Sequence, residues 1–152
     1  MKLSPHFSLE EFTASQICER KGWDNTPSPE VLNNLKFLAE KLEDVRNILR
    51  SPMLISSGYR SGALNNYLGS KRTSSHTVGL AVDFISPSFG SPEEIVEKIV
   101  NSDIEYDQVI LEHYNKEKKT GWVHLSFHPE HPRKQALIID KEGVRPFENT
   151  IS

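Results

Sequence analysis

The chain has 152 residues, of which 36% are hydrophobic and 26% are charged, and its formal net charge is −3. This length suits a single domain, over residues 1–152, whose core needs no disulfide framework. The single cysteine, Cys18, excludes an internal disulfide and a thiolate metal cage. The weak negative charge gives no reason to expect a nucleic-acid partner or attraction to anionic membranes. We expect the protein to act as a monomer.

The first half of the chain predicts mainly helices. The segment 8–21 begins with the pattern of a capping box and predicts a short helix. A longer helix is predicted over residues 30–50, with Ser28 as its N-cap and Pro29 in its first turn. Its apolar residues recur every three or four positions, at Leu35, Leu38, Leu42, Val45 and Leu49.

The second half predicts short strands, one further helix and polar loops. The longest loop, 59–75, is rich in Asn, Gly and Ser and has room for one helical turn, and Ser91 begins a helix that runs to Val100. Predicted strands lie at 52–58, 80–85, 107–113, 121–127 and 135–140. We therefore expect an α+β fold with a small antiparallel sheet, helices packed on one face and a functional site on the other.

Three side chains that bind metals well are associated with two of these strands. Asp83 lies within the strand at 80–85 with His76 shortly before it, and His124 lies within the strand at 121–127. Alternation along a strand places His124 on the face opposite its apolar neighbours, beside Asp83 if the two strands are adjacent. A lone His–Asp pair is usually a surface hydrogen bond, but two imidazoles and a carboxylate with an open fourth position are typical of a catalytic zinc site. The sequence therefore predicts bound Zn²⁺.

The motif around these residues closely resembles a known family. Ser74-x-His76-x-x-Gly79-x-Ala81-x-Asp83, followed by Trp122-x-His124, resembles the D-alanyl-D-alanine carboxypeptidase-type zinc peptidases. That family includes peptidoglycan carboxypeptidases and phage L-alanyl-D-glutamate endolysins, and it shares a zinc core with hedgehog signalling domains. Ser57-Gly58-Tyr59-Arg60-Ser61 matches a further element of the family, and the N-terminal segment 7–12 is similar to its phage-type branch.

The resemblance implies roles for individual residues. The implied zinc ligands are His76, Asp83 and His124. Arg60 would bind a substrate carboxylate or carbonyl, which suits the planar donors of a guanidinium; a solvated loop arginine is the alternative. Ser74 would bind substrate or shape the ligand loop, and its alternative is a hydroxyl that only caps local backbone. Trp122 would form a wall of the substrate pocket.

The sequence departs from the family pattern at the general base. Family members commonly carry Glu or Asp about three residues before the final histidine, where this chain has Gly121. The nearest carboxylate belongs to Glu112 on the preceding strand, and a hairpin would place it opposite Trp122, within reach of a zinc-bound water near His124. A shift of one residue would turn Glu112 away. We predict Glu112 as the base and Asp107 as the weaker substitute, against the alternative of a solvated strand carboxylate.

The implied function is zinc-dependent hydrolysis of a peptide bond in the peptidoglycan stem, by a phage or prophage cell-wall lytic enzyme of the carboxypeptidase or endopeptidase type. Zinc would polarise the scissile carbonyl and lower the pKa of a bound water. The alternative, which Gly121 favours, is a non-catalytic zinc-binding virion component or peptidoglycan-binding module. Because no signal peptide or membrane span is recognisable, we expect synthesis in the cytoplasm and action on the wall after release or within a virion.

Overall fold

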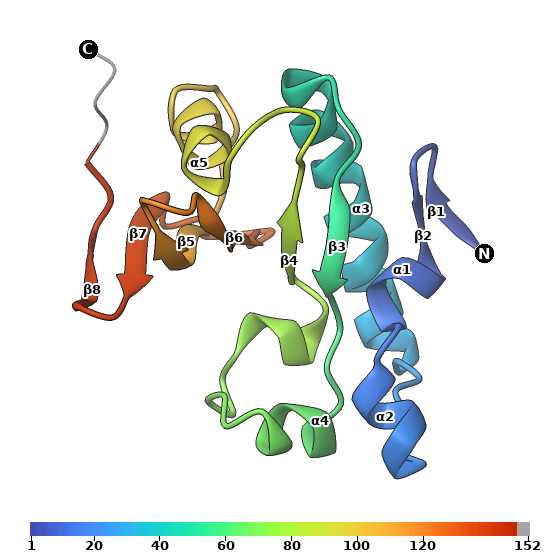
Figure 1. Ribbon diagram of the computed structural model, residues 1–152. Helices are drawn as coiled ribbons and strands as arrows, with labels where there is room; N and C mark the ends of the chain where they lie inside the picture. The colour runs from blue at the N-terminus through green and yellow to red at the C-terminus, as the bar shows by residue number, and fades with distance from the viewer. Residues whose placement is uncertain (149–152) are drawn as a thin grey trace.

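The computed structural model describes residues 1–148 and shows helices and strands arranged around one twisted sheet (Figure 1). In chain order the elements are β1 (Lys2–Ser4), β2 (Phe7–Ser8), α1 (Leu9–Thr13), α2 (Gln16–Lys21), α3 (Pro29–Leu49), β3 (Leu54–Ser57), α4 (Gly62–Tyr67), the 3₁₀ helix η1 (Ser75–Val78), β4 (Ala81–Ile85), α5 (Pro92–Val100), β5 (Gln108–Asn115), β6 (Thr120–Ser126), β7 (Gln135–Asp140) and β8 (Gly143–Pro146). None of the helices in this described part has the length and apolar character that crossing a bilayer requires.

The two main core helices begin where the sequence predicts. Ser28 Oγ accepts a hydrogen bond from the backbone N–H of Val31, and Pro29 occupies the first turn of α3, where a missing N–H costs no helical hydrogen bond. Ser91 and Glu94 form a capping box at the start of α5. The apolar residues of both helices pack into the core, so both helices cover the same face of the sheet.

The helix predicted at 8–21 is interrupted, so this prediction was wrong in part. Ala14 has an extended backbone, with φ −62° and ψ 132°, between α1 and α2. Ser15 begins α2, and its Oγ accepts a hydrogen bond from the backbone N–H of Cys18 at 3.2 Å. A serine side chain that caps a new helix offers the backbone an alternative to continuing the old one. The predicted loop at 59–75, in which the sequence allows one helical turn, contains the short helix α4.

The main sheet is larger than predicted and is mixed, so the expected small antiparallel sheet was wrong. Its strand order is β3-β4-β6-β5-β7-β8, and a separate two-stranded sheet joins β1 and β2. β7 pairs with β5 in parallel, and the other neighbours are antiparallel. The physical reason is the return of the chain after β6 to the start of β5, where Gln135 N–H donates to the Asp107 carbonyl. β7 therefore runs in the same direction as β5.

Alternation along the central strands separates the core from the candidate site. Apolar residues of β4, β5 and β6 enter the core with α3 and α5: Val82, Phe84, Val109, Leu111, Val123 and Leu125. Asp83 and His124 each lie between two of these residues and Glu112 directly follows Leu111, and side chains alternate between the faces of a sheet. The three polar side chains therefore lie on the face opposite α3 and α5, as the sequence predicts.

Asp107 holds the chain segment that leads into β7. Its Oδ1 accepts hydrogen bonds from Arg133 N and Nε at 3.0 and 2.9 Å, and its Oδ2 accepts one from Nη2 at 2.9 Å. Hydrogen bonds from Arg133 outweigh burial and keep the pKa of the Asp107 carboxyl below its ordinary value. Both carboxylate oxygens are thus engaged in structure.

Replacing Asp107 by asparagine should lower the free energy of unfolding by about 1 kcal/mol near neutral pH, because the partner guanidinium is partly exposed. The folded carboxyl has a lower pKa than the unfolded one, so this stabilisation is present above the unfolded pKa, roughly 4. It is lost as pH falls through the folded pKa. Urea unfolding of both proteins at neutral and acidic pH tests this, and a difference in unfolding free energy that persists in acid contradicts it.

Candidate metal centre

β4 and β6 place two of the predicted ligands side by side. Asp83 and His124 are direct partners in the antiparallel pairing of these strands, and paired residues on one face are close neighbours. Asp83 Oδ1 lies 3.1 Å from His124 Nδ1. Both residues are buried on the face of the sheet that the core helices leave open.

The third predicted ligand reaches the same point from η1. Ser74 begins this short helix, and its Oγ accepts a hydrogen bond from the backbone N–H of His76. The carbonyl oxygen of Gly58 lies 2.8 Å from His76 Nδ1, and a carbonyl can only accept, so Nδ1 carries the proton. The other ring nitrogen, Nε2, then faces Asp83 Oδ1 at 3.3 Å. A carbonyl that orients the ring in this way is typical of metal-binding histidines.

The donor atoms of these three residues fit a zinc ion. One donor atom from each of His76, Asp83 and His124 lies within 4.8 Å of the others, and the side chains are 2%, 5% and 9% exposed. Burial alone raises the pKa of the Asp83 carboxyl, but its contacts with the His124 and His76 imidazoles outweigh burial and hold the pKa below its ordinary value. The carboxylate therefore stays ionised, as a metal ligand must be. Two nitrogens and one oxygen are a donor set that zinc accepts.

Glu112 lies next to this group on β5. It pairs with Trp122 across the β5–β6 hairpin, which is the register that the sequence predicts. Glu112 Oε1 is 3.9 Å from His124 Nδ1, and Oε2 accepts a hydrogen bond from Trp122 Nε1 at 3.0 Å. Burial, and then the negative charge of Asp83, raise the pKa of Glu112 above its ordinary value. A held carboxylate with a raised pKa has the properties of a general base.

Steric contacts explain why position 121 is a glycine. Gly121 has φ +111°, and a Cβ added there would lie 2.5 Å from the Glu112 carbonyl oxygen and 3.0 Å from that of His113. The pairing of β5 with β6 is irregular just after Glu112, where His113 has φ 51°. No side chain therefore fits at the position where the resembling family commonly has its acid, and the nearest carboxylate comes from the adjacent strand.

A sequence profile described as Peptidase M15 matches residues 5–126. The chain belongs to the peptidase M15 family. This confirms the resemblance to the D-alanyl-D-alanine carboxypeptidase-type zinc peptidases, and it identifies the protein as a zinc metallopeptidase. M15 peptidases depend on zinc, and the buried group of His76, Asp83 and His124 can hold that metal. A search among curated proteins finds no match to the sequence.

In this M15 peptidase Arg60 lies beside the metal centre rather than in solvent. Its Nη2 donates to Asp83 Oδ2 at 3.2 Å, its Nε to Ser57 Oγ at 3.1 Å and its Nη1 to Ser70 Oγ at 3.0 Å. The side chain is only 12% exposed, so the alternative of a solvated loop arginine was wrong. A guanidinium has five N–H donors, and two are left for another partner. Arg60 thus orients Asp83 and keeps donors for a ligand.

The remaining predicted site residues have different surroundings. Trp122 stacks on His113, with ring centroids 4.6 Å apart, and lines a groove beside the centre. Ser74 caps η1, so its observed contact is the backbone cap, and its contact with substrate stays a prediction. Asp107 is bound by Arg133 and lies outside the group of metal-donor residues.

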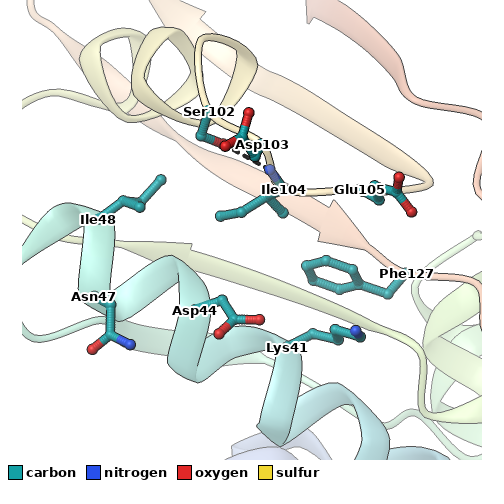
Figure 2. A pocket seen from close by; sticks show the side chains of 9 residues that line it. All are labelled: Lys41, Asp44, Asn47, Ile48, Ser102, Asp103, Ile104, Glu105 and Phe127. Carbon is teal, nitrogen blue, oxygen red and sulfur yellow. Dashed lines mark hydrogen bonds between the residues drawn. The ribbon is translucent and has the colours of Figure 1, made fainter.

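A groove with a cavity volume of about 650 Å³ opens beside Asp83. Residues between Ala14 and Glu19 form one part of its lining, and this segment includes the break between α1 and α2. Leu64 of α4 and Leu68, which caps the C-terminus of α4, form another part. The size of the groove falls in the range of pockets that bind small-molecule ligands, roughly 300–1,000 Å³. Another hollow, of about 480 Å³, lies between α3 and the turn after α5, and its lining includes none of the metal-centre residues (Figure 2).

Three supporting residues were missed from the sequence. Gly58 orients His76 through its carbonyl oxygen, and Ser57 and Ser70 accept hydrogen bonds from Arg60. Ser57 and Gly58 immediately precede Tyr59 and Arg60 in the family element, which was an available signal. Ser70 carried none, because its contact with Arg60 depends on how the 59–75 segment folds.

Proposed function

We propose that this M15 peptidase hydrolyses a peptide bond in the peptidoglycan stem and serves a phage or prophage as a cell-wall lytic enzyme. The observation that carries the proposal is the convergence of His76, Asp83 and His124 with Glu112, beside a groove that Asp83 and Arg60 line. The peptidoglycan substrate is inferred from the family. Both a carboxypeptidase and an L-alanyl-D-glutamate-type endopeptidase are compatible with this arrangement.

In the proposed reaction, different residues bind the metal, transfer the proton and bind the substrate. Zinc, when held by the two histidines and Asp83, would supply polarisation of the scissile carbonyl and a lowered pKa for water. Glu112 accepts a proton from the attacking water as the new C–O bond forms, and passes it to the nitrogen as the C–N bond breaks. Trp122 fixes Oε2 of this carboxylate, so Oε1, the oxygen nearer His124, takes the proton. The two spare N–H groups of Arg60 bind a substrate carboxylate or carbonyl.

We further propose that the protein is made in the cytoplasm as a monomer and reaches the wall after release or as a virion component. Fractionation of a producing culture before and after lysis tests this proposal. Protein that appears outside the cytoplasm before any membrane damage, in a fraction free of virions, would contradict it.

Replacing Glu112 by glutamine should lower peptidoglycan hydrolysis by about 10²- to 10⁴-fold while zinc stays bound, because the amide keeps the shape of the side chain but cannot take a proton. The measurement is turbidity loss of purified peptidoglycan, with mass spectrometry of the released peptides to identify the bond that is cut. Glu117→Gln, in the exposed turn of the same hairpin, is the matched control and should retain full activity.

Two other outcomes point elsewhere. Equal lysis by wild type and Glu112→Gln would keep the peptidase but assign the base to another group. If neither protein lyses peptidoglycan from several types of cell wall although both bind zinc, the result would favour the non-catalytic zinc-binding module. The sequence argument for a non-catalytic module was the missing acid at position 121. The structure gives glycine at this position a steric reason, because no side chain fits there, so this argument no longer favours the module.

A further inference from the structure

The groove beside the metal centre has one charge without a partner. Its charged lining residues are Glu19, Arg60 and Asp83. Arg60 and Asp83 pair with each other at 3.2 Å. Glu19 lines the groove from α2 and is exposed. The charges of Arg60 and Asp83 therefore offset each other, and the Glu19 carboxylate is the remaining charge in the groove lining.

Nothing within residues 1–148 neutralises the Glu19 carboxylate through an ion pair or a side-chain hydrogen bond. Its backbone groups are used by the helix, with N–H donating to the Ser15 carbonyl and C=O accepting from Gly22. The nearby cation of Lys21 is placed over two aromatic rings, with Nζ 5.9 Å from the Trp23 centroid and 5.1 Å from that of Tyr67. The carboxylate is thus available to a ligand in the groove.

The surroundings of Glu19 suit an amine on an aliphatic chain. Ile17 precedes it on the same wall, and Leu64 and Leu68 contribute apolar side chains to the same groove. Leu68 is 44% exposed, so its side chain is open to a ligand that enters the groove. An alkyl chain can cover these apolar side chains while its ammonium group pairs with a carboxylate.

We propose that Glu19 selects peptide substrates that carry an aliphatic ammonium group, as a diamino acid in a stem peptide does. The ammonium pairs with Glu19, and its alkyl stem packs on Ile17, Leu64 and Leu68. Arg60 meanwhile binds a carboxylate or carbonyl near the metal centre, so the substrate is recognised at two charges of opposite sign. This inference rests on the proposed function for cleavage of the peptide bond. It adds to that function a preference for substrates with a side-chain ammonium group.

The test compares two synthetic stem peptides that contain lysine and differ only in acetylation of its side-chain amine. Wild type should cleave the free amine with about fivefold higher kcat/KM, the size expected for a partly exposed ion pair. Glu19→Gln should abolish this preference, and Glu19→Lys should reverse it. Glu40→Gln, which removes an exposed carboxylate of α3 outside the groove, should leave the preference unchanged.

Binding of the same peptides distinguishes failure of this inference from failure of the proposed function. Calorimetry with zinc-loaded Glu112→Gln, alone and combined with Glu19→Gln, measures affinity without cleavage. A preference for the free amine that disappears with Glu19→Gln supports the selection even if neither peptide is cut by wild type. Equal affinities, or a preference that survives Glu19→Gln, overturn the inference and leave a peptidase intact if cleavage is observed.

Discussion

Replacing His76 by alanine is expected to abolish stoichiometric zinc binding and to lower peptidase activity by about a thousandfold or more. His76 Nε2 faces Asp83 at 3.3 Å, and the Gly58 carbonyl holds the ring in the orientation that a ligand needs. Without this imidazole, two protein ligands remain, which is fewer than catalytic zinc sites use. Zinc content after dialysis, measured by atomic absorption, and peptide release from peptidoglycan test the prediction.

His128→Ala is the matched control for this experiment. His128 is exposed just after β6, where its Nδ1 accepts hydrogen bonds from the backbone N–H groups of Glu130 and His131. This variant should bind zinc and cleave like wild type. Circular dichroism establishes that both variants are folded. One zinc per chain in folded His76→Ala would show that this histidine is not a ligand.

Adding a single methyl group at position 121 should cost about 3–5 kcal/mol of unfolding free energy, through strain at positive φ and overlap with a backbone atom. A Cβ on Gly121 would lie 2.5 Å from the Glu112 carbonyl oxygen, and this atom cannot move without disturbing the β5–β6 pairing. For a chain of this length the melting temperature should fall by about 6–20 °C. Thermal unfolding of Gly121→Ala measures the change.

Gly143→Ala separates the two causes of this loss. Gly143 has φ +106°, close to the φ of +111° at Gly121, but no heavy atom lies within 4 Å of its added Cβ. It should therefore lose only the strain contribution, about 1 kcal/mol. Equal losses for the two variants would refute the steric explanation. The same clash predicts that Gly121→Glu damages the fold and does not restore activity to Glu112→Gln.

Local patterns predicted the elements whose causes are local. The caps at Ser28 and Ser91 and the apolar stripe of α3 are read within a few residues of one another, because a helix repeats every turn. The pairing of Glu112 with Trp122 was also predictable, since a short turn between two strands leaves few registers. The grouping of His76, Asp83 and His124 followed from strand alternation together with a specific family motif.

The sequence by itself determined the family, the three candidate metal ligands that the structure groups together and the separation of core from site, because these depend on residue type and on the period of each element. Only the tertiary structure decided the parallel placement of β7, the contact of Arg60 with Asp83 and the groove that the break between α1 and α2 helps to line. It also decided why position 121 is glycine. These features depend on atoms that lie close in space but apart in the chain, and no local pattern records such distances.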